Sequence, residues 1–529
     1  MGRGASTIIR TLQAAFRCLI PILAGSTMPV WATEPPAAPA KAREDAVAAM
    51  FDEAAKSPLT LRMFLRTMPK GGDLHNHLGG AIYAEDFIAW AREADFCRTA
   101  DGLSVEPPPC PADRSLKRIK GQESNELARL TDSFSTRGYQ QGVGRNEVSG
   151  NTQFFQTFSR FGPIGTISSA KMLAAERRMA AADHLSYVEL DHDTSTLSAY
   201  IFTGPDVPLS EKDLPTRFDE EMRSLAPLLG RASAELDRDE AAARKELACD
   251  GIRPDPGCAV TVHYLFQGFR ALPPSQVFRS LILAFAMADH DPRYVGINIV
   301  QPEDHVVALR DYDLHMAMIR FLATKFPKIH RTLHAGELTF GEVPPAELRG
   351  HIAKAIAAGA ERIGHGVDIA YEDDARGTMA LMARKGIAVE INLTSNDVIL
   401  GVKGDQHPLS LYRKMGVPVA LSTDDQGVLR TDMTNEYVRA AREQGLGYAD
   451  LKSVARASLE YSFIPGASLW NERRIGDSVA PCAASFGAPT CTRFLATSEK
   501  ARIEAEFEEK IVAFEQAQLS RRMPAMITK

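Results

Sequence analysis

Eight short apolar or β-branched segments, separated by longer amphipathic ones, constrain the fold of this chain more than any other feature. The segments are Gly71–His77, Leu185–Leu190, Ala259–Phe266, Tyr294–Val300, Ile329–His334, Arg362–His365, Ala388–Leu393 and Val417–Ser422. Helical periodicity follows several of them, as in Pro345–Ala358 and Asp373–Lys385. Strands that alternate with helices form parallel sheets, and eight such units close into a barrel. We therefore predict an α/β fold of the (β/α)8 TIM-barrel type.

Two connections are longer than a barrel requires. Leu78–His184, after the first strand, includes a polar stretch from Asp113 to Arg145, and Asp191–Cys258, after the second, includes a charge-rich helical segment over Glu211–Ala248. Residues 497–517 form an amphipathic helical extension near the C-terminus. We predict a linker and N-terminal helix over 33–60, and a barrel domain over 61–529 with an insertion at about 90–150.

The N-terminal segment has the features of an export signal. Arg3 and Arg10 precede an apolar stretch around Cys18–Gly25, and Ala32 suits a signal-peptidase cleavage site. We expect a signal peptide over 1–32 and a secreted or periplasmic protein. The alternative is a disordered or membrane-anchoring N-terminus, although the apolar stretch is too short to span a bilayer.

Six cysteines follow this segment in three local pairs. The spacing is 13, 9 and 9 residues, and no C-x-x-C spacing typical of a zinc site occurs. Six cysteines allow 15 connectivities. Neighbour pairing is the simplest, because each bridge then closes one loop without crossing the core. Together with the export signal this favours disulfides over reduced cysteines acting as small hydrophobes. The expected pairs are Cys97–Cys110, Cys249–Cys258 and Cys482–Cys491.

The overall charge limits the range of partners. The formal net charge is -6 and hydrophobic residues make up 45% of the chain, which indicates a large soluble core. No strongly basic balance supports binding to nucleic acid or to an acidic membrane surface. We expect a small, uncharged substrate, no nucleic acid and no stable membrane insertion. A homodimer is one option for the assembly, which the sequence leaves open.

Ionisable residues end four of the predicted strands. In a strand, residues i and i+2 point to the same face, so His75 and His77 can aim together into the barrel mouth. Each motif alone is weak: a strand-end histidine is often structural, and an acidic pair can cap a helix. All these ends converge on one face of a TIM barrel. The full set is His75, His77, His334, Glu337, His365, Asp424 and Asp425.

Three imidazoles and a carboxylate suit a hydrolytic zinc site. Zinc accepts nitrogen and oxygen ligands, and a catalytic site leaves a position for water, whose pKa the metal lowers to about 7. Iron, cobalt or manganese can fill similar sites. The H-E-x-x-H motif of helix-borne protease sites is absent from the sequence, as is the H-x-E…P-C-x-x-C signature of cytidine-type deaminases.

The motifs MPKGGDLHNHLGGAIY, HAGE, RIGHG, NLTSN and LSTDD resemble, in order, those of the adenosine deaminase family of the amidohydrolase superfamily. The likeness runs from about Pro69 to about Pro465. The export signal, the insertion and the cysteine pairs resemble the secreted branch of adenosine-deaminase-related growth factors, and the opening motif resembles bacterial exported members.

The resemblance implies a role for each strand-end residue. One zinc ion per chain would be held by His75, His77, His334 and Asp424. Glu337 would donate a proton to the purine N1, for which burial must raise its pKa. His365 would orient the attacking water and take or share its proton. Asp425 would hydrogen-bond the N7 side of the purine.

Four further positions are candidate substrate contacts. The acidic residue that contacts the ribose in classical members is replaced by Gly79, so the sugar must be held differently or the sugar preference is relaxed. Gln301 and Glu303 follow the fourth strand, where classical members meet the purine edge. Glu303 has an equally good interpretation as a helix N-terminal charge. Phe154 lies in a segment that resembles an apolar lid, although such aromatics are also typical of plain core.

We therefore expect zinc-dependent hydrolytic deamination of adenosine or 2′-deoxyadenosine to inosine or 2′-deoxyinosine and ammonia. One alternative is a deaminase of another aminopurine or aminated heterocycle on the same scaffold, which Gly79 keeps open. A second is a non-catalytic secreted protein that binds nucleosides or acts as a signal. The presence of the complete set of strand-end residues argues against the second alternative.

Overall fold

The predicted barrel is present. The computed structural model describes residues 40–119, 125–139, 148–203 and 206–527, so the expected signal peptide lies outside the described residues. One eight-stranded sheet has the order β1-β4-β5-β6-β7-β8-β9-β10, and its neighbouring strands are parallel. The strands are β1 (Gly71–His77), β4 (Leu185–Asp191), β5 (Thr261–Phe269), β6 (Tyr294–Val300), β7 (His330–Ala335), β8 (Arg362–His365), β9 (Ala388–Ile391) and β10 (Val419–Leu421).

The sheet closes on itself next to the metal-binding motif. The His77 backbone N–H donates to the Asp424 carbonyl over 3.0 Å, and the Asp424 N–H donates to the His75 carbonyl over 2.9 Å. These bonds join the end of β1 to the residues that follow β10. Barrel closure therefore brings the first and last predicted ligand segments into direct contact.

Three predicted strands have the bounds that the sequence indicates, and the others shift at their ends. β9 and β10 stop before Asn392 and Ser422, because these residues begin the turns that lead out of the barrel. The prediction of a helix from Pro345 was wrong, since α13 (His351–Ala357) begins after Gly350, whose φ of -175° and ψ of 13° are not helical.

Helices surround the barrel and extend from it. Around the first two strands lie α1 (Ala40–Ala54), α2 (Pro58–Leu65), α3 (Leu78–Ala81), α4 (Ala84–Glu93), α5 (Asn125–Ser133), α6 (Gly150–Gly165), α7 (Ser169–Ala182), α8 (Ser195–Ile201) and α9 (Leu214–Glu246). The later strands alternate with α10 (Pro274–His290), α11 (Val306–Arg310), α12 (Tyr312–Lys325), α13, α14 (Ala375–Lys385), α15 (Leu393–Leu400), α16 (Leu409–Lys414), α17 (Gln426–Leu429), α18 (Met433–Gln444) and α19 (Tyr448–Glu460). The chain continues through α20 (Pro489–Leu495) and α21 (Glu499–Ile527), which is longer than the predicted terminal helix.

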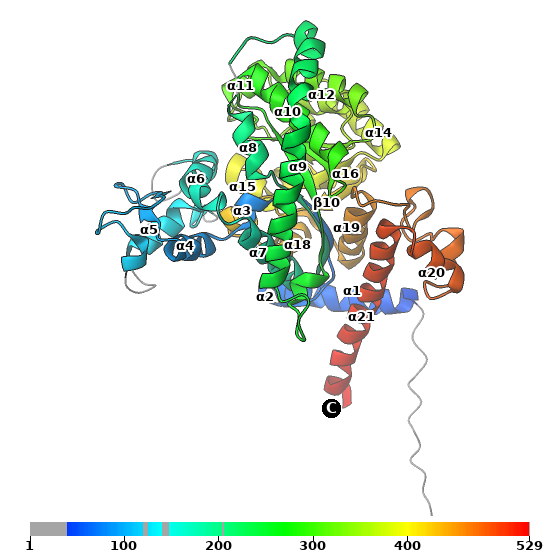
Figure 1. Ribbon diagram of the computed structural model, residues 1–529. Helices are drawn as coiled ribbons and strands as arrows, with labels where there is room; N and C mark the ends of the chain where they lie inside the picture. Colours follow the sequence, from blue (N-terminus) through cyan, green and yellow to red (C-terminus); the bar gives the residue numbers. More distant parts are fainter. Residues whose placement is uncertain (1–39, 120–124, 140–147, 204–205, 528–529) are drawn as a thin grey trace, which may run out of the picture.

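The insertion after β1 forms a lobe at one side of the barrel. α4, α5 and α6 project away from the side that carries α20 and α21 (Figure 1). Their contact is aromatic, with Phe87 of α4 stacked on Phe161 of α6 at 4.7 Å between ring centroids. A short antiparallel pair, β2 (Cys97–Arg98) and β3 (Val105–Glu106), completes the lobe. α6 also contacts α3 and α17, so the lobe reaches the mouth of the barrel.

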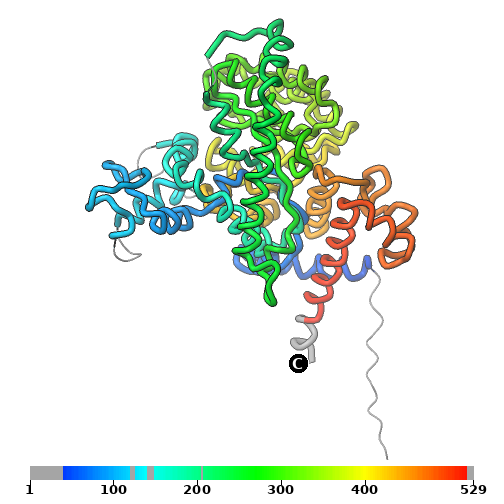
Figure 2. The backbone as a smooth tube through the Cα atoms, in the orientation of Figure 1, coloured from blue at the N-terminus to red at the C-terminus, as the bar shows by residue number. Residues whose placement is uncertain are grey.

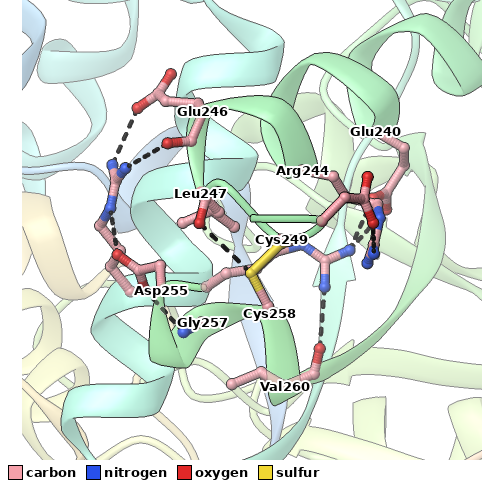
Figure 3. Close-up of a disulfide and its surroundings, with 12 residues drawn as sticks. Glu240, Arg244, Glu246, Leu247, Cys249, Asp255, Gly257, Cys258 and Val260 are labelled. Atoms are coloured by element: carbon pink, nitrogen blue, oxygen red, sulfur yellow. Dashed lines mark hydrogen bonds and ion pairs between the residues drawn. A yellow bond between two sulfur atoms is a disulfide. The ribbon is translucent and has the colours of Figure 1, made fainter. Parts of the chain in front are cut away.

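The six cysteines lie in the three predicted pairs. Cα–Cα distances are 5.3 Å for Cys97–Cys110, 5.6 Å for Cys249–Cys258 and 4.5 Å for Cys482–Cys491. The second pair joins the end of α9 to the segment that leads into β5 (Figure 3). Each pair closes a local loop of 9 or 13 residues, as neighbour pairing requires.

A charged cluster joins the two ends of the described chain. Glu515 of α21 accepts from Arg43 of α1 and from Lys452 and Tyr448 of α19, at 2.7, 2.8 and 3.0 Å. α1 and α21 consequently pack together below the barrel (Figure 2). Among the described helices, none is both long enough and apolar enough to cross a membrane.

Candidate metal centre and active site

The four predicted metal ligands meet at the carboxyl ends of β1, β7 and β10. One ligand atom from each of them lies within 4.8 Å of the others. The Nε2 atoms of His75 and His334 are 3.0 Å apart, and Asp424 Oδ1 lies 3.5 Å from His75 Nε2 and 3.3 Å from His77 Nε2. Tetrahedral zinc with bonds of about 2.0–2.1 Å places its ligand atoms about 3.3 Å apart. The set therefore fits one zinc-sized cation.

The outer nitrogens of two imidazoles show which atoms face the centre. His75 Nδ1–H donates to Glu390 Oε2 over 2.7 Å, and His334 Nδ1 lies 2.9 Å from Asn298 Oδ1. Because the Ile299 backbone N–H also donates to Asn298 Oδ1, that oxygen is the acceptor for His334. Both Nδ1 atoms therefore face acceptors outside the centre, and both Nε2 atoms face into it. The two Nε2 atoms are 3.0 Å apart and can bind one cation together.

Backbone strain marks three of the strand ends. Gln301, His365 and Asp424 have φ values of 82°, 65° and 61°, in the left-handed region that side chains with a Cβ seldom adopt. Such conformations cost about 1–3 kcal/mol each and persist where the surrounding structure enforces them. They turn the chain sharply out of the barrel and direct the His365 and Asp424 side chains into its mouth.

Glu337 lies beside the metal set in the turn that follows β7. Its Oε1 is 3.6 Å from His365 Nε2, and its Oε2 is 3.9 Å from Arg270 Nη2. Burial, reinforced by the Asp424 carboxylate, raises the pKa of Glu337 well above 4.5 in spite of Arg270. Glu337 thus favours the protonated form, as a proton donor at neutral pH requires.

Asp425 faces the same space from the end of β10. Its Oδ1 is buried and has no hydrogen-bond partner among the described residues. Burial and the adjacent Asp424 raise the pKa of Asp425 well above 3.8. A Cβ on Gly80 would lie 1.6 Å from Asp425 Oδ1, so only glycine fits opposite this carboxyl. An unpartnered polar atom in such a position suits a ligand.

His365 completes the group at the mouth. Burial lowers the pKa of His365 to about 3, and burial with the neighbouring imidazoles lowers that of His334 well below 6.5. The rings are consequently neutral, which suits metal binding and hydrogen bonding rather than charge.

The further substrate-contact candidates occupy different environments. Gly79 borders open space, since a Cβ there would meet no described atom within 4 Å. The Gln301 side-chain oxygen accepts from the Ala271 N–H over 2.8 Å. Phe154 is buried on α6, with Phe155 and Phe158 at 5.0 and 5.4 Å between centroids.

Glu303 lies behind the Glu337 turn. Its carboxylate accepts from the backbone N–H groups of Gly336 and Glu337, at 3.1 and 2.9 Å, and from His351 Nδ1 at 2.6 Å. These contacts hold the turn that carries Glu337. A direct contact between Glu303 and substrate stays a prediction.

Several residues of the site were missed in the sequence. Arg270, Asn298 and Glu390 are buried in or directly after β5, β6 and β9, and each contacts a metal ligand or Glu337. Asp191, at the end of β4, has Oδ2 4.0 Å from His77 Nδ1. Their signal was a single polar residue within or just after an otherwise apolar strand, which is too common to be specific.

Comparison with known proteins agrees with this geometry. A sequence model described as "Adenosine deaminase" matches residues 236–480. Aminodeoxyfutalosine deaminase from Streptomyces coelicolor is 34% identical over 154 residues, 28% of this chain and 36% of that protein. Adenosine deaminase from Serratia proteamaculans is 38% identical over 134 residues, 25% of this chain and 37% of that protein. The chain thus spans little more than a third of these relatives.

A solved structure, the apo N6-methyl-AMP deaminase from Arabidopsis thaliana, superposes with a TM-score of 0.49 and 20% identity, covering 76% of this chain and 94% of that one. By its own fold and site, the present molecule is a TIM-barrel protein with a candidate metal centre at the carboxyl ends of its strands. The matched region contains His334, Glu337, His365 and the Asp424-Asp425 pair. Over residues 236–480 the sequence is similar to the adenosine deaminase family.

Proposed function

We propose that this chain is a zinc-dependent hydrolase that deaminates adenosine or 2′-deoxyadenosine to inosine or 2′-deoxyinosine and ammonia. One observation carries the proposal: two buried carboxyl groups with raised pKa values, Glu337 and Asp425, face a four-residue metal set from separate strand ends. A purine needs a proton donor at a ring nitrogen and a hydrogen-bond partner on its other edge. A protonated carboxyl supplies each of these.

The residues divide the chemistry among them. Zinc held by His75, His77, His334 and Asp424 would supply a hydroxide nucleophile near neutral pH. Glu337 gives its proton to N1 of the purine, which makes C6 more electrophilic as attack begins. Asp425 binds the N7 side and sets the ring orientation. His365 orients the attacking oxygen from the side of β8. The proton of the added hydroxyl then passes to the amino group, and the C6–N bond breaks as the C6 carbonyl forms, which releases ammonia.

A different aminopurine nucleoside is the second candidate. The open space at Gly79 favours it, because a Cβ there would meet no described atom within 4 Å and the position offers no side chain to select one sugar. An aminodeoxyfutalosine deaminase is among the matched relatives. The chemistry at the metal centre would be the same in both cases.

Ammonia release from a panel of substrates tests the proposal. Purified, zinc-loaded protein is assayed with adenosine, 2′-deoxyadenosine, adenine and aminodeoxyfutalosine, beside the variants Glu337→Ala and Glu342→Ala. Glu342 is a half-buried acid farther along the same loop and serves as the matched control. We expect the nucleosides to be deaminated, the first variant to be inactive and the second to retain activity. Turnover of adenine alone, or unchanged turnover in Glu337→Ala, would overturn the proposal.

We also propose that the chain is exported and that its three cysteine pairs are oxidised. The signal-like N-terminus and the Cα–Cα distances of 5.3, 5.6 and 4.5 Å within the pairs support this. Recovery of the protein from the periplasmic fraction measures export. Thiol titration of that protein after denaturation, with and without reductant, measures the oxidation of the cysteine pairs. Free thiols in the unreduced sample, or recovery only from the cytoplasm, would contradict it.

A further inference from the structure

A chain of hydrogen bonds leads from the backbone after β9 to the ring of His365. The Leu409 N–H donates to His407 Nδ1 over 3.2 Å. His407 Nε2 lies 3.0 Å from Asn396 Oδ1, and Asn396 Nδ2 lies 2.9 Å from His365 Nδ1. All three side chains are buried, with exposed fractions of 3% or less. None of these bonds involves a metal ligand.

The backbone amide sets the proton on His407. A backbone N–H can only donate, so His407 Nδ1 is an acceptor and carries no hydrogen in the neutral ring. Burial, reinforced by Arg439, lowers the pKa of His407 to about 3, and the ring is therefore neutral. Its single hydrogen is on Nε2, which must donate to Asn396.

The direction of that bond sets the orientation of Asn396. Only the amide oxygen can accept from His407 Nε2–H, so the amide nitrogen is turned toward His365. The amide nitrogen can only donate, and His365 Nδ1 must accept from it. Asn392 Nδ2 lies 3.4 Å from His365 Nδ1 and 3.5 Å from its Nε2, so Asn396, at 2.9 Å from Nδ1, is the contact that distinguishes the two nitrogens.

We propose that Asn396 and His407 are positioning residues that hold His365 as the Nε2–H tautomer, so that its ring presents a hydrogen-bond donor, not a proton-accepting lone pair, to the metal centre. His365 Nε2 is the atom nearest to Glu337, at 3.6 Å. In the proposed deamination, on which this role rests, His365 orients the attacking oxygen by donating to it and does not remove its proton. This role differs from the expectation that His365 also takes or shares a proton.

Nitrogen NMR of the zinc-loaded protein tests the tautomer without any assay of activity. Protein labelled with ¹⁵N-histidine gives distinct signals for protonated and unprotonated ring nitrogens, and the missing signals in His365→Gln assign those of His365. We expect a protonated Nε2 and an unprotonated Nδ1 in the wild type. A protonated Nδ1 would overturn the inference.

Two sets of variants test the hydrogen-bond chain. Asn396→Asp places a carboxylate against both rings, so His365 Nδ1 must take the hydrogen. We expect the NMR spectrum to show a protonated Nδ1 and an unprotonated Nε2. We also expect kcat to fall by at least about tenfold, with KM changed far less. His407→Leu removes the donor, whereas His407→Gln keeps an N–H at a similar place. We expect loss of kcat in the first and rescue in the second. Equal kcat values, or a tautomer that Asn396→Asp leaves unchanged, would refute the positioning role.

These outcomes separate the inference from the proposed function. If no substrate in the panel releases ammonia, the deaminase proposal fails, while the NMR result still decides the tautomer. If deamination occurs and His365 carries its hydrogen on Nδ1, the inference fails and the deaminase proposal stands.

Discussion

Substitution of Glu303 by glutamine should destabilise the turn that carries Glu337. Glu303 is 1% exposed, and its carboxylate lies 3.6 Å from Arg270 Nη1 in addition to its bonds to the turn and to His351. Glutamine has one acceptor oxygen in place of two and removes the charge that balances Arg270. Breaking a buried pair in this way leaves an uncompensated charge in the protein interior.

The magnitude follows from the pKa of Glu303. Burial alone would raise it, but Arg270 and His351 outweigh burial and lower the pKa from 4.5 to about 2. At 1.36 kcal/mol per pKa unit, the charged form contributes about 3 kcal/mol to the free energy of unfolding. Because the folded-state pKa is the lower one, this contribution is fully present above about pH 4.5 and is lost as the pH falls toward about 2.

Chemical denaturation of wild type and Glu303→Gln at pH 7 and at pH 3 measures the effect. We expect the variant to be less stable by about 3 kcal/mol at pH 7 and the difference to shrink at pH 3. Glu342→Gln is the matched control, because burial and Asp304 raise the pKa of Glu342 to about 7, so its charge does not stabilise the fold at neutral pH. An equal loss in both variants, or a difference that does not depend on pH, would refute the reasoning.

Three further predictions concern the metal centre and the substrate side. His334→Ala should lower the zinc content measured by mass spectrometry to less than about a tenth of the wild-type value, and near-stoichiometric zinc in it would contradict the ligand set. Glu390→Gln should weaken zinc binding by about 10- to 100-fold in a chelator competition, since Glu390 orients the His75 imidazole. An unchanged zinc affinity would show that Glu390 does not orient this ligand. Gly80→Ala should lower kcat by about 100-fold, because the added Cβ displaces the Asp425 carboxyl. Gly79→Ala should leave kcat unchanged, because its Cβ meets no described atom. Equal kcat values for the two variants would contradict a contact between residue 80 and Asp425.

The fold could be predicted from the sequence because it depends on periodicity. β1, β6 and β8 have the bounds that the apolar runs indicate, and the two long connections lie where the spacing between runs widens. The errors are at element ends, as at α13, which begins only after Gly350. The cysteine pairs also follow the sequence, because each joins near neighbours on one loop.

The candidate site also has a part that the sequence predicts and a part that it does not. The metal set is visible in the sequence, since residues at the carboxyl ends of parallel strands must converge on one face. The roles of Arg270, Asn298 and Glu390 cannot be predicted from the sequence, because one polar residue in a buried strand has no spacing that identifies its hydrogen-bond partner. That partner depends on the strand register and on the inward direction of each side chain.

The sequence by itself therefore determined which chemical groups this barrel brings to its mouth. Only the tertiary structure decided which atoms of these groups face one another. The proton position on His365 depends on a backbone N–H at Leu409, 44 residues away along the chain, through His407 and Asn396. A hydrogen bond is directional, so its donor and acceptor become known only when the atoms on both sides are in place.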